Sequence, residues 1–299
     1  MLVFTRGGPS LYHDSDRVHI VKGDIRNSND LSLALQGCSP DVVIHLAALH
    51  YIPYCVEHPD ETRTINVGGT GNLLACLKDI PDCKYFIMAS SAAVYKDKEA
   101  QLTETDPLKS IDIYGETKIQ CENLVEAEDI ESINYRVLRF FNVYGPHDPI
   151  PHIIPEIVKQ LRDGGVLKLG HTENYRDFIH TTDIASAIVA TISPGLERRC
   201  TLNIGTGNPI SVQEIIRMCE SLIKKREPSF VLNSATIDVQ KIRPTDRKML
   251  CADIRKISTQ TKWYPSISLE SGLDELLKVE GVYEAVSRRC VPRSETQAS

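Results

Sequence analysis

Two side chains separated by one helical turn, Tyr114 and Lys118, could together perform acid–base chemistry. A spacing of four residues places both side chains on one face of a helix. Free tyrosine has a pKa near 10, so a tyrosine base at neutral pH needs roughly three pKa units of tyrosinate stabilisation, or about 4 kcal/mol. A neighbouring ammonium and a positively charged cofactor ring are suitable sources. The pair therefore indicates a tyrosine base with a lysine partner, although the same spacing occurs by chance on many exposed helices.

Other polar and small residues stand at the ends of predicted strands. Ser90 and Ser91 lie in the run ASSAAVY, where hydroxyls would point into the crevice in which open parallel sheets bind ligands. Two more strand ends carry the runs Gly23-Asp24-Ile25 and His45-Leu46-Ala47-Ala48. Small residues allow the backbone to approach a flat ligand, and an aspartate can accept a hydrogen bond from an exocyclic amine. Each of these runs alone is weak evidence for a ligand site. A lone Ser-Ser pair, for example, is more simply explained as a polar strand end with a capping serine.

The elements that must position these residues alternate between strands and helices. Strands are predicted over 2–5, 18–21, 42–46, 85–89 and 135–140, and helices over 29–36, 64–77 and 114–128. This alternation is typical of a parallel sheet covered by helices. The predicted fold class is therefore α/β, with a doubly wound, Rossmann-like parallel sheet.

The texture of the sequence changes after Gly145, where GPHDPIPHIIP holds four prolines and indicates a crossing between two lobes. We expect a dinucleotide-binding domain over 1–145 and a smaller C-terminal substrate-binding lobe over 146–287, with 172–205 packing back on the first domain. A polar tail is expected over 288–299. In the second lobe we expect helices over 154–162, over 183–192 and after Ser211, with a strand pair around 166–169 and a strand over 202–205. Ser211 and Glu214 form a predicted capping box.

The order and spacing of these runs resemble the extended short-chain dehydrogenase/reductase family, the sugar-nucleotide epimerases and dehydratases. The resemblance covers nearly the whole chain, through GDI, HLAA, NVGGT, SSAAVY, YGETK, RFFNVYGP, RDFIHTTD, NIGTG and RPTD. It implies NAD as cofactor, with NADP possible, and a nucleotide sugar as substrate. It also implies a homodimer through the helices around 66–77 and 114–128, although Leu73, Leu74 and Leu77 are equally compatible with core packing.

The resemblance assigns roles residue by residue. Tyr114 would be the catalytic base, Lys118 its electrostatic partner, and Ser91 the hydroxyl between substrate and tyrosine. The residues implied in cofactor binding are Arg6, Asp24, Ile25, Leu46, Ala47, Ala48, Ser90, Tyr114, Lys118 and Phe140. Those implied in substrate binding are Ser91, Asn142, Arg176, Arg243 and Asp246. The arginines would hold the diphosphate, because planar guanidinium groups pair well with phosphate.

Two alanines narrow the expected reaction. Family members that eliminate water or decarboxylate have an acidic residue just after the serine or threonine position, where this chain has Ala92 and Ala93. Dehydration is therefore disfavoured. Epimerisation at C4 through a 4-keto sugar remains the leading prediction, with reduction of a 4-keto sugar nucleotide as the alternative.

The N-terminal region departs from the family. Its members begin with a strand, a Gly-x-x-Gly-x-x-Gly turn and a helix that receives the cofactor pyrophosphate, and Gly7-Gly8-Pro9 does not match that turn. The first strand is central in the order 3-2-1-4-5-6, so its absence would split the sheet. Three explanations stay open: a start site inside a longer gene product, a strand 2–5 that takes the central position, or a non-catalytic relative that binds sugar nucleotides. We expect weak or absent NAD(P) binding.

Composition excludes several other classes of protein. The 299 residues carry 34 Lys and Arg against 40 Asp and Glu, so a general nucleic-acid binder with a basic face is not expected. No apolar run reaches the roughly 18 residues of a membrane span, and no signal peptide is recognisable. Nine cysteines without a Cys-x-x-Cys pair indicate reduced thiols, and the scattered histidines predict no metal site. We expect a cytoplasmic enzyme.

Overall fold

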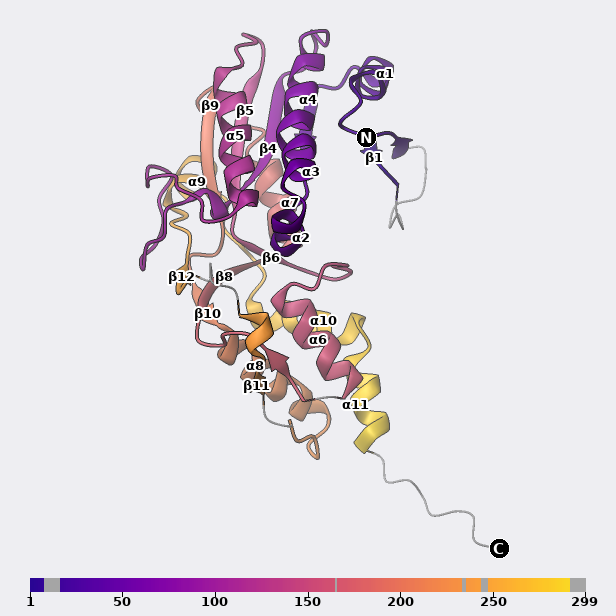
Figure 1. Ribbon diagram of the computed structural model, residues 1–299, viewed down its shortest axis with the longest axis vertical. Coiled ribbons are helices and arrows are strands. Elements are labelled where there is room, and N and C mark those ends of the chain that lie inside the picture. Colours follow the sequence, from indigo (N-terminus) through magenta and orange to yellow (C-terminus); the bar gives the residue numbers. More distant parts are fainter. Residues whose placement is uncertain (8–16, 165, 233–234, 243–246, 291–299) are drawn as a thin grey trace, which may run out of the picture.

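The computed structural model describes residues 1–7, 17–164, 166–232, 235–242 and 247–290. Figure 1 shows an upper body, in which a sheet is covered by helices, and a lower body of helices and short strands. No helix in the described part of the chain is both long and apolar enough to cross a membrane. The nine cysteines are all free thiols.

A parallel sheet of four strands forms the centre of the upper body. Its order is β3 (Val42–His45), β4 (Tyr85–Ser91), β5 (Asn134–Phe140) and β9 (Arg199–Ile204), and every neighbouring pair is parallel. The five central residues of β4 and of β5 are buried. Such near-continuous burial is expected of a parallel strand that is covered on both faces. The predicted α/β class is confirmed.

Alternate residues of these strands supply two cores. Phe86 and Met88 of β4 join the core beneath α1 (Ser28–Cys38), α4 (Gly69–Leu77) and α5 (Ile113–Ala127). Ile87 joins the opposite core, beneath α7 (Thr181–Ala190) and α9 (Arg255–Thr261). Helices on both faces make the sheet doubly wound, as predicted. The stripe of Leu73, Leu74 and Leu77 is buried in the first core, so it packs inside the chain, and a homodimer stays a prediction.

The first two strands form a separate sheet. β1 (Leu2–Thr5) pairs in parallel with β2 (His19–Lys22), and neither is hydrogen-bonded to the four-stranded sheet. This small sheet is attached through the residues after β2, because Ile25 packs against Gly69 of α4 and Asn72 donates to the carbonyls of Ile25 and Arg26. The expectation of a split sheet is confirmed. The alternative in which strand 2–5 takes the central position is wrong for this structure.

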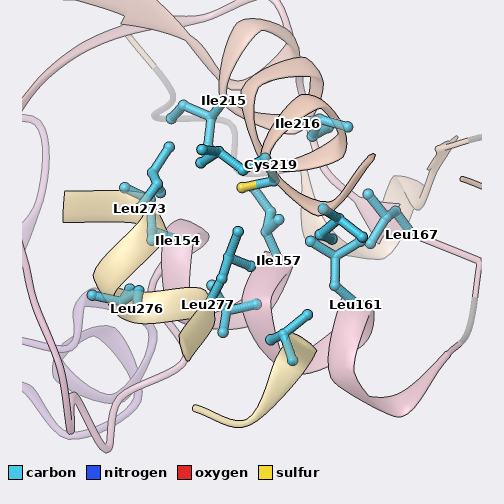
Figure 2. Close-up of a cluster of buried hydrophobic side chains, with 14 of the residues drawn as sticks. Ile154, Ile157, Leu161, Leu167, Ile215, Ile216, Cys219, Leu273, Leu276 and Leu277 are labelled. Atoms are coloured by element: carbon cyan, nitrogen blue, oxygen red, sulfur yellow. The ribbon is translucent and has the colours of Figure 1, made fainter. Parts of the chain in front are cut away.

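The lower body has its own core between helices and a second sheet. The helices are α6 (Ile153–Asp163), α8 (Val212–Arg226), α10 (Leu269–Val279) and α11 (Val282–Cys290), and the strands are β6 (Asn142–Tyr144), β8 (Tyr175–His180), β10 (Pro209–Ser211) and β12 (Met249–Leu250). Figure 2 shows Ile157, Cys219 and Leu277 from three of these helices meeting in the core. The capping box of Ser211 and Glu214 is present. Arg288 to Cys290, at the start of the predicted tail, belong to α11, and residues 291–299 lie outside the described part.

Short elements complete the chain. They are α2 (Ile52–Glu57), α3 (Pro59–Arg63), a π-helical turn (Thr64–Gly68) before α4, and 3₁₀ turns at Ala92–Val94 and Val239–Lys241. The strand pair expected around 166–169 is wrong as a local hairpin. Only β7 (Lys168–Leu169) forms there, and its parallel partner is the distant β11 (Thr236–Ile237). The predicted domain limits at 145 and 287 are not otherwise tested.

Candidate active site

Tyr114 and Lys118 lie on one face of the first turns of α5, as their spacing predicts. Asp112 caps this helix by accepting a hydrogen bond from the backbone N–H of Gly115. The Lys118 ammonium lies 5.9 Å from the centre of the Tyr114 ring and donates to the carbonyl oxygen of Ala89 at 2.7 Å. Lys118 is only 4% exposed, so the carbonyl fixes a buried charge next to the tyrosine.

The surroundings of the pair do not by themselves favour tyrosinate. Burial raises the pKa of Tyr114, and its hydrogen bond with Ser91 offsets only part of this effect. Burial also lowers the pKa of Lys118. The phenol therefore stays protonated at neutral pH, and the stabilisation that a tyrosine base requires must come from a positive charge brought into the site.

A glycine allows α5 to approach the strand end that carries the serines. A Cβ at Gly115 would lie 2.1 Å from Ser110 Oγ and 2.6 Å from the carbonyl oxygen of Ala93. Both distances are shorter than van der Waals contact. Glycine at this position therefore allows the Tyr114 hydroxyl to reach Ser91.

The two serines at the end of β4 serve different purposes. Ser91 Oγ accepts a hydrogen bond from the backbone N–H of Ala93 at 3.1 Å and is also the partner of Tyr114. Ser90 is 2% exposed, and its hydroxyl donates to Glu122 at 2.5 Å. The hydroxyl predicted to serve the cofactor thus donates its proton to a carboxylate inside the protein.

A buried polar network lies behind the serines. Glu122 Oε1 and Oε2 accept from Arg139 at 3.0 and 2.7 Å. Arg139 also donates to the Tyr95 hydroxyl, which donates to Asn203 of β9 at 2.5 Å. The network joins α5 to β4, β5 and β9. Sequence reasoning missed it, although Glu122 stands four residues after Lys118, on the same helical face.

The loop after β3 is held by hydrogen bonds from the helices. Asn66 Oδ1 accepts from the backbone N–H of Leu49 at 2.7 Å, and Asn66 Nδ2 donates to the Leu49 carbonyl and to Thr117, each at 3.0 Å. Leu46 and Ala47 are exposed at this strand end. Exposed apolar side chains at the carboxyl end of a parallel strand are suited to contact with a flat ligand.

Two of the residues predicted to hold the adenine and ribose already have partners within the chain. The carboxylate of Asp24 binds the Arg26 guanidinium, with an Nη2–Oδ2 distance of 2.6 Å, and this hydrogen bond lowers the pKa of Asp24 to about 2. Arg6 is close enough to contribute to the same shift. Ile25 is buried against α4. A nucleotide would have to share Asp24 with Arg26.

The residues predicted to hold the sugar nucleotide are placed only in part. Asn142, at the start of β6, has a buried Oδ1 without a hydrogen-bond partner among the described residues. Such an acceptor is suited to a donor from a ligand. Arg176 lies in β8 and donates to the Tyr175 carbonyl at 2.8 Å, and Phe140 packs at the end of β5. Arg243 and Asp246 lie outside the described residues.

Comparison with known proteins identifies the family. A family model described as GDP-mannose 4,6 dehydratase matches residues 8–276. The chain belongs to the extended short-chain dehydrogenase/reductase family of sugar-nucleotide epimerases and dehydratases. A UDP-glucuronate 4-epimerase of Thermodesulfobacterium geofontis is 32% identical over 84% of this chain and 75% of its own length. A UDP-glucose 4-epimerase of Lactobacillus helveticus is 29% identical over 82% of this chain and 78% of its own length.

Solved structures agree on the family fold. A UDP-glucuronic acid 4-epimerase from Bacillus cereus, in complex with UDP-glucuronic acid and NAD, superposes with a TM-score of 0.78 at 27% identity. The match covers 89% of this chain and 82% of that one. MoeE5 in complex with UDP-glucuronic acid and NAD has a TM-score of 0.81 at 24% identity, over 97% of this chain and 91% of its own.

One further arginine of this family member was not predicted. Arg247 is 6% exposed and donates to the carbonyls of Ala93 and Tyr95 at 3.2 and 2.6 Å. It thereby holds the turn that follows Ser91. The RPTD motif drew attention to Arg243 and Asp246, which precede Arg247 in the chain. Nothing in the sequence distinguished an arginine that binds backbone carbonyls from one that binds phosphate.

Proposed function

We propose that this chain catalyses epimerisation of a nucleotide sugar at C4, through a 4-keto intermediate, with NAD as cofactor. The observation that carries the proposal is the arrangement of Ser91, Tyr114 and Lys118, in which a buried phenol is hydrogen-bonded to a serine beside a buried ammonium. The 4-epimerase activities that the relatives' names carry support it.

Each residue has a separate role in this proposal. Tyr114 takes the proton from the C4 hydroxyl and later returns it, Ser91 orients that hydroxyl, and Lys118 stabilises the tyrosinate. When bound, NAD supplies the acceptor and donor of hydride that carry C4 through the ketone, and its positive ring supplies charge that favours tyrosinate. The exposed residues Leu46 and Ala47 would lie against it.

The fit of the cofactor differs between its two ends. Around Tyr114 the described residues suit a nicotinamide ribose, since Lys118 offers a donor and the end of β3 is open. At the other end, Asp24 is already bound to Arg26. We therefore expect weak binding at that end.

A second candidate function is binding of a nucleotide sugar without turnover. The separate sheet of β1 and β2 favours it, because the cofactor of this fold normally lies across a continuous sheet. Reduction of a 4-keto sugar is the remaining alternative within the family, and it would consume the cofactor in each turnover.

Incubation of the purified chain with UDP-glucose or UDP-glucuronate and a large excess of NAD tests these functions. An epimerase forms the C4 epimer, seen by NMR, without net formation of NADH. Tyr114→Phe should lower the rate by about 10²-fold or more and leave the affinity for UDP unchanged, whereas Tyr264→Phe, at an exposed tyrosine, should change neither. Wild-type protein that binds UDP and never turns over would establish the second function.

A further inference from the structure

A buried carboxylate lies where the upper body meets the lower body. Asp177 of β8 is 0% exposed, and each of its two oxygens accepts two hydrogen bonds. Oδ1 accepts from the backbone N–H and from the hydroxyl of Thr206, at 2.8 and 2.5 Å. Oδ2 accepts from the backbone N–H groups of Gly207 and Ala252, at 2.9 and 3.0 Å. Figure 1 shows β8 and β12 at this junction.

These four bonds join segments that are distant in the chain. Thr206 and Gly207 follow the end of β9, which belongs to the sheet of the upper body, whereas β8 belongs to a different sheet. Ala252 follows β12, which pairs with β8. The approach is close, because a Cβ at Gly205 would lie 2.7 Å from Asp177 Oδ2 and 2.7 Å from the Cβ of Ala252. The carboxylate therefore binds β8 to the segment that leaves the upper sheet.

The Asp177 side chain carries a negative charge in this position. Burial raises the pKa of Asp177, and the hydrogen bonds from Thr206, Ala252 and Gly207 oppose this effect. A carboxylate has about four lone-pair sites, and four donors occupy them here, so none remains for a proton. The charge is therefore fixed in β8, one residue from Arg176.

The strand that Asp177 holds carries the described residues expected to contact the nucleotide sugar, or pairs with them. Successive side chains of a strand point to opposite faces of the sheet, so Arg176 projects away from Asp177. Arg176 is half-buried, whereas Asp177 is buried. Asn142 of β6 is paired with Phe178 of β8. The placement of β8 therefore sets the placement of both Arg176 and Asn142.

The segment on the other side of the carboxylate leads to the catalytic residues. Arg247 lies five residues before Ala252 and donates to the carbonyls of Ala93 and Tyr95. These carbonyls belong to the turn that follows Ser91. The Asp177 carboxylate thus binds a segment that is already hydrogen-bonded to the serine turn.

A second connection runs through Leu102, which pairs with Ala252 in a β-bridge. The Leu102 carbonyl accepts from Asn203 Nδ2 at 2.8 Å, and Asn203 Oδ1 accepts from the Tyr95 hydroxyl. Tyr95 belongs to the buried network of Glu122, a residue of α5. The segment around Ala252 is therefore connected to α5 as well as to the serine turn.

We propose that Asp177 is a positioning residue, which fixes β8 and its Arg176 at the right separation from Ser91 and Tyr114. This inference rests on the proposed function and deepens it, because it assigns part of the affinity for the nucleotide sugar to a buried residue. Removal of a negative charge near a bound diphosphate should strengthen binding by direct electrostatics. Loss of the four bonds should instead let β8 shift and weaken binding. The two effects have opposite signs.

Calorimetric titration of the full chain with UDP and with UDP-glucose tests the proposal. Asp177→Asn turns one acceptor oxygen into a donor that faces other donors, and we expect both dissociation constants to rise about tenfold with an unchanged ratio. Circular dichroism checks that the variant is folded at the temperature of the titration.

The matched control is Asp183→Asn, the same change at another buried carboxylate. Asp183 is 1% exposed and accepts from the backbone N–H and hydroxyl of Ser266 and from the backbone N–H of Ile267. None of these partners lies in β8, β9 or β12. We expect a lower melting temperature with dissociation constants close to those of the wild type.

A milder pair of variants keeps the test valid if Asp177→Asn does not fold. Thr206→Val removes only the bond between the Thr206 hydroxyl and Asp177 Oδ1 from the four, and both dissociation constants should rise about threefold. Thr206→Ser retains the hydroxyl and should bind as the wild type does.

The outcomes separate this inference from the proposed function. Folded Asp177→Asn that binds UDP as tightly as the wild type, or more tightly, overturns the positioning role. An equal loss of affinity in Asp183→Asn overturns it as well, because the loss would then follow from general destabilisation. The same holds if Thr206→Val and Thr206→Ser bind alike. A folded wild-type chain that binds neither UDP nor UDP-glucose overturns the proposed function and this inference with it.

Discussion

Glu122 and Arg139 form a buried ion pair with two parallel hydrogen bonds of 3.0 and 2.7 Å, directly behind the strand end that carries Ser91. The side chains are 9% and 6% exposed. Arg139 lies in β5 and Glu122 in α5, so the pair fixes the helix that bears Tyr114 and Lys118 against the sheet. The Ser90 hydroxyl donates a hydrogen bond to the same carboxylate.

Replacement of Glu122 by glutamine should strongly destabilise the chain. The change leaves the Arg139 guanidinium buried without its counter-charge, which typically costs about 3–5 kcal/mol of the free energy of unfolding. Urea denaturation measures it. The matched control is Glu126→Gln, at an exposed glutamate one turn further along α5, where a change within about 0.5 kcal/mol is expected. A loss below about 1 kcal/mol in Glu122→Gln would show that Arg139 finds another partner.

Gly115→Ala should damage both stability and turnover. The new Cβ would lie 2.6 Å from a backbone oxygen, that of Ala93, so the start of α5 must move away from the serines. We expect a loss of about 1–3 kcal/mol in the free energy of unfolding, with a lower kcat. Gly37→Ala is the control, because a Cβ there meets nothing within 4 Å and should be neutral or stabilising. An unchanged kcat in Gly115→Ala would mean that the close approach of α5 is not needed.

Most of the strands of the upper body could be predicted because they are short apolar runs with clear ends. The prediction for 2–5 matches β1 residue for residue, and those for 42–46 and 135–140 differ from β3 and β5 by one residue. The Tyr114–Lys118 pair could be found because helical spacing alone puts both side chains on one face. The prediction of a strand pair around 166–169 failed because the pairing is not local. β7 pairs with the distant β11, and the sequence pattern near β7 cannot reveal that partner.

The supporting residues of the site could not be predicted, for a physical reason. Glu122, Arg139 and Arg247 are charged, and charged residues in a sequence are normally assigned to the surface. Their burial depends on partners that are distant in the chain, as with Arg247 and the carbonyl of Tyr95. The use of the Ser90 hydroxyl by Glu122 has the same origin, since either serine of the pair could have faced the crevice.

The pH dependence of turnover should report on Lys118. If Tyr114 is the base, kcat/KM rises with pH as the phenol loses its proton in the complete site. Lys118→Met removes a neighbouring positive charge, which raises the pKa of Tyr114 and moves the rising limb to higher pH by about one unit or more. The profile of Lys224→Met, at a lysine of α8 in the other body, should match wild type. Coincident profiles for Lys118→Met and wild type would remove Lys118 from the proposed role.

Affinity for NAD should be low in the 299-residue chain. A pyrophosphate is normally bound by free backbone N–H groups at a helix N-terminus. The described helix nearest to Asp24 is α1, whose first turn is already capped by Asn27, and the backbone N–H of Asp24 is used by Asp30. Arg6 directly follows β1, and β1 is not paired with β3 in a common sheet. We therefore expect that denaturation of the purified chain releases no bound nucleotide. Titration of the folded chain with NAD should give a dissociation constant far above the micromolar range. A dissociation constant in the low micromolar range would show that the chain builds a pyrophosphate site from other residues, and the second candidate function would then lose its support.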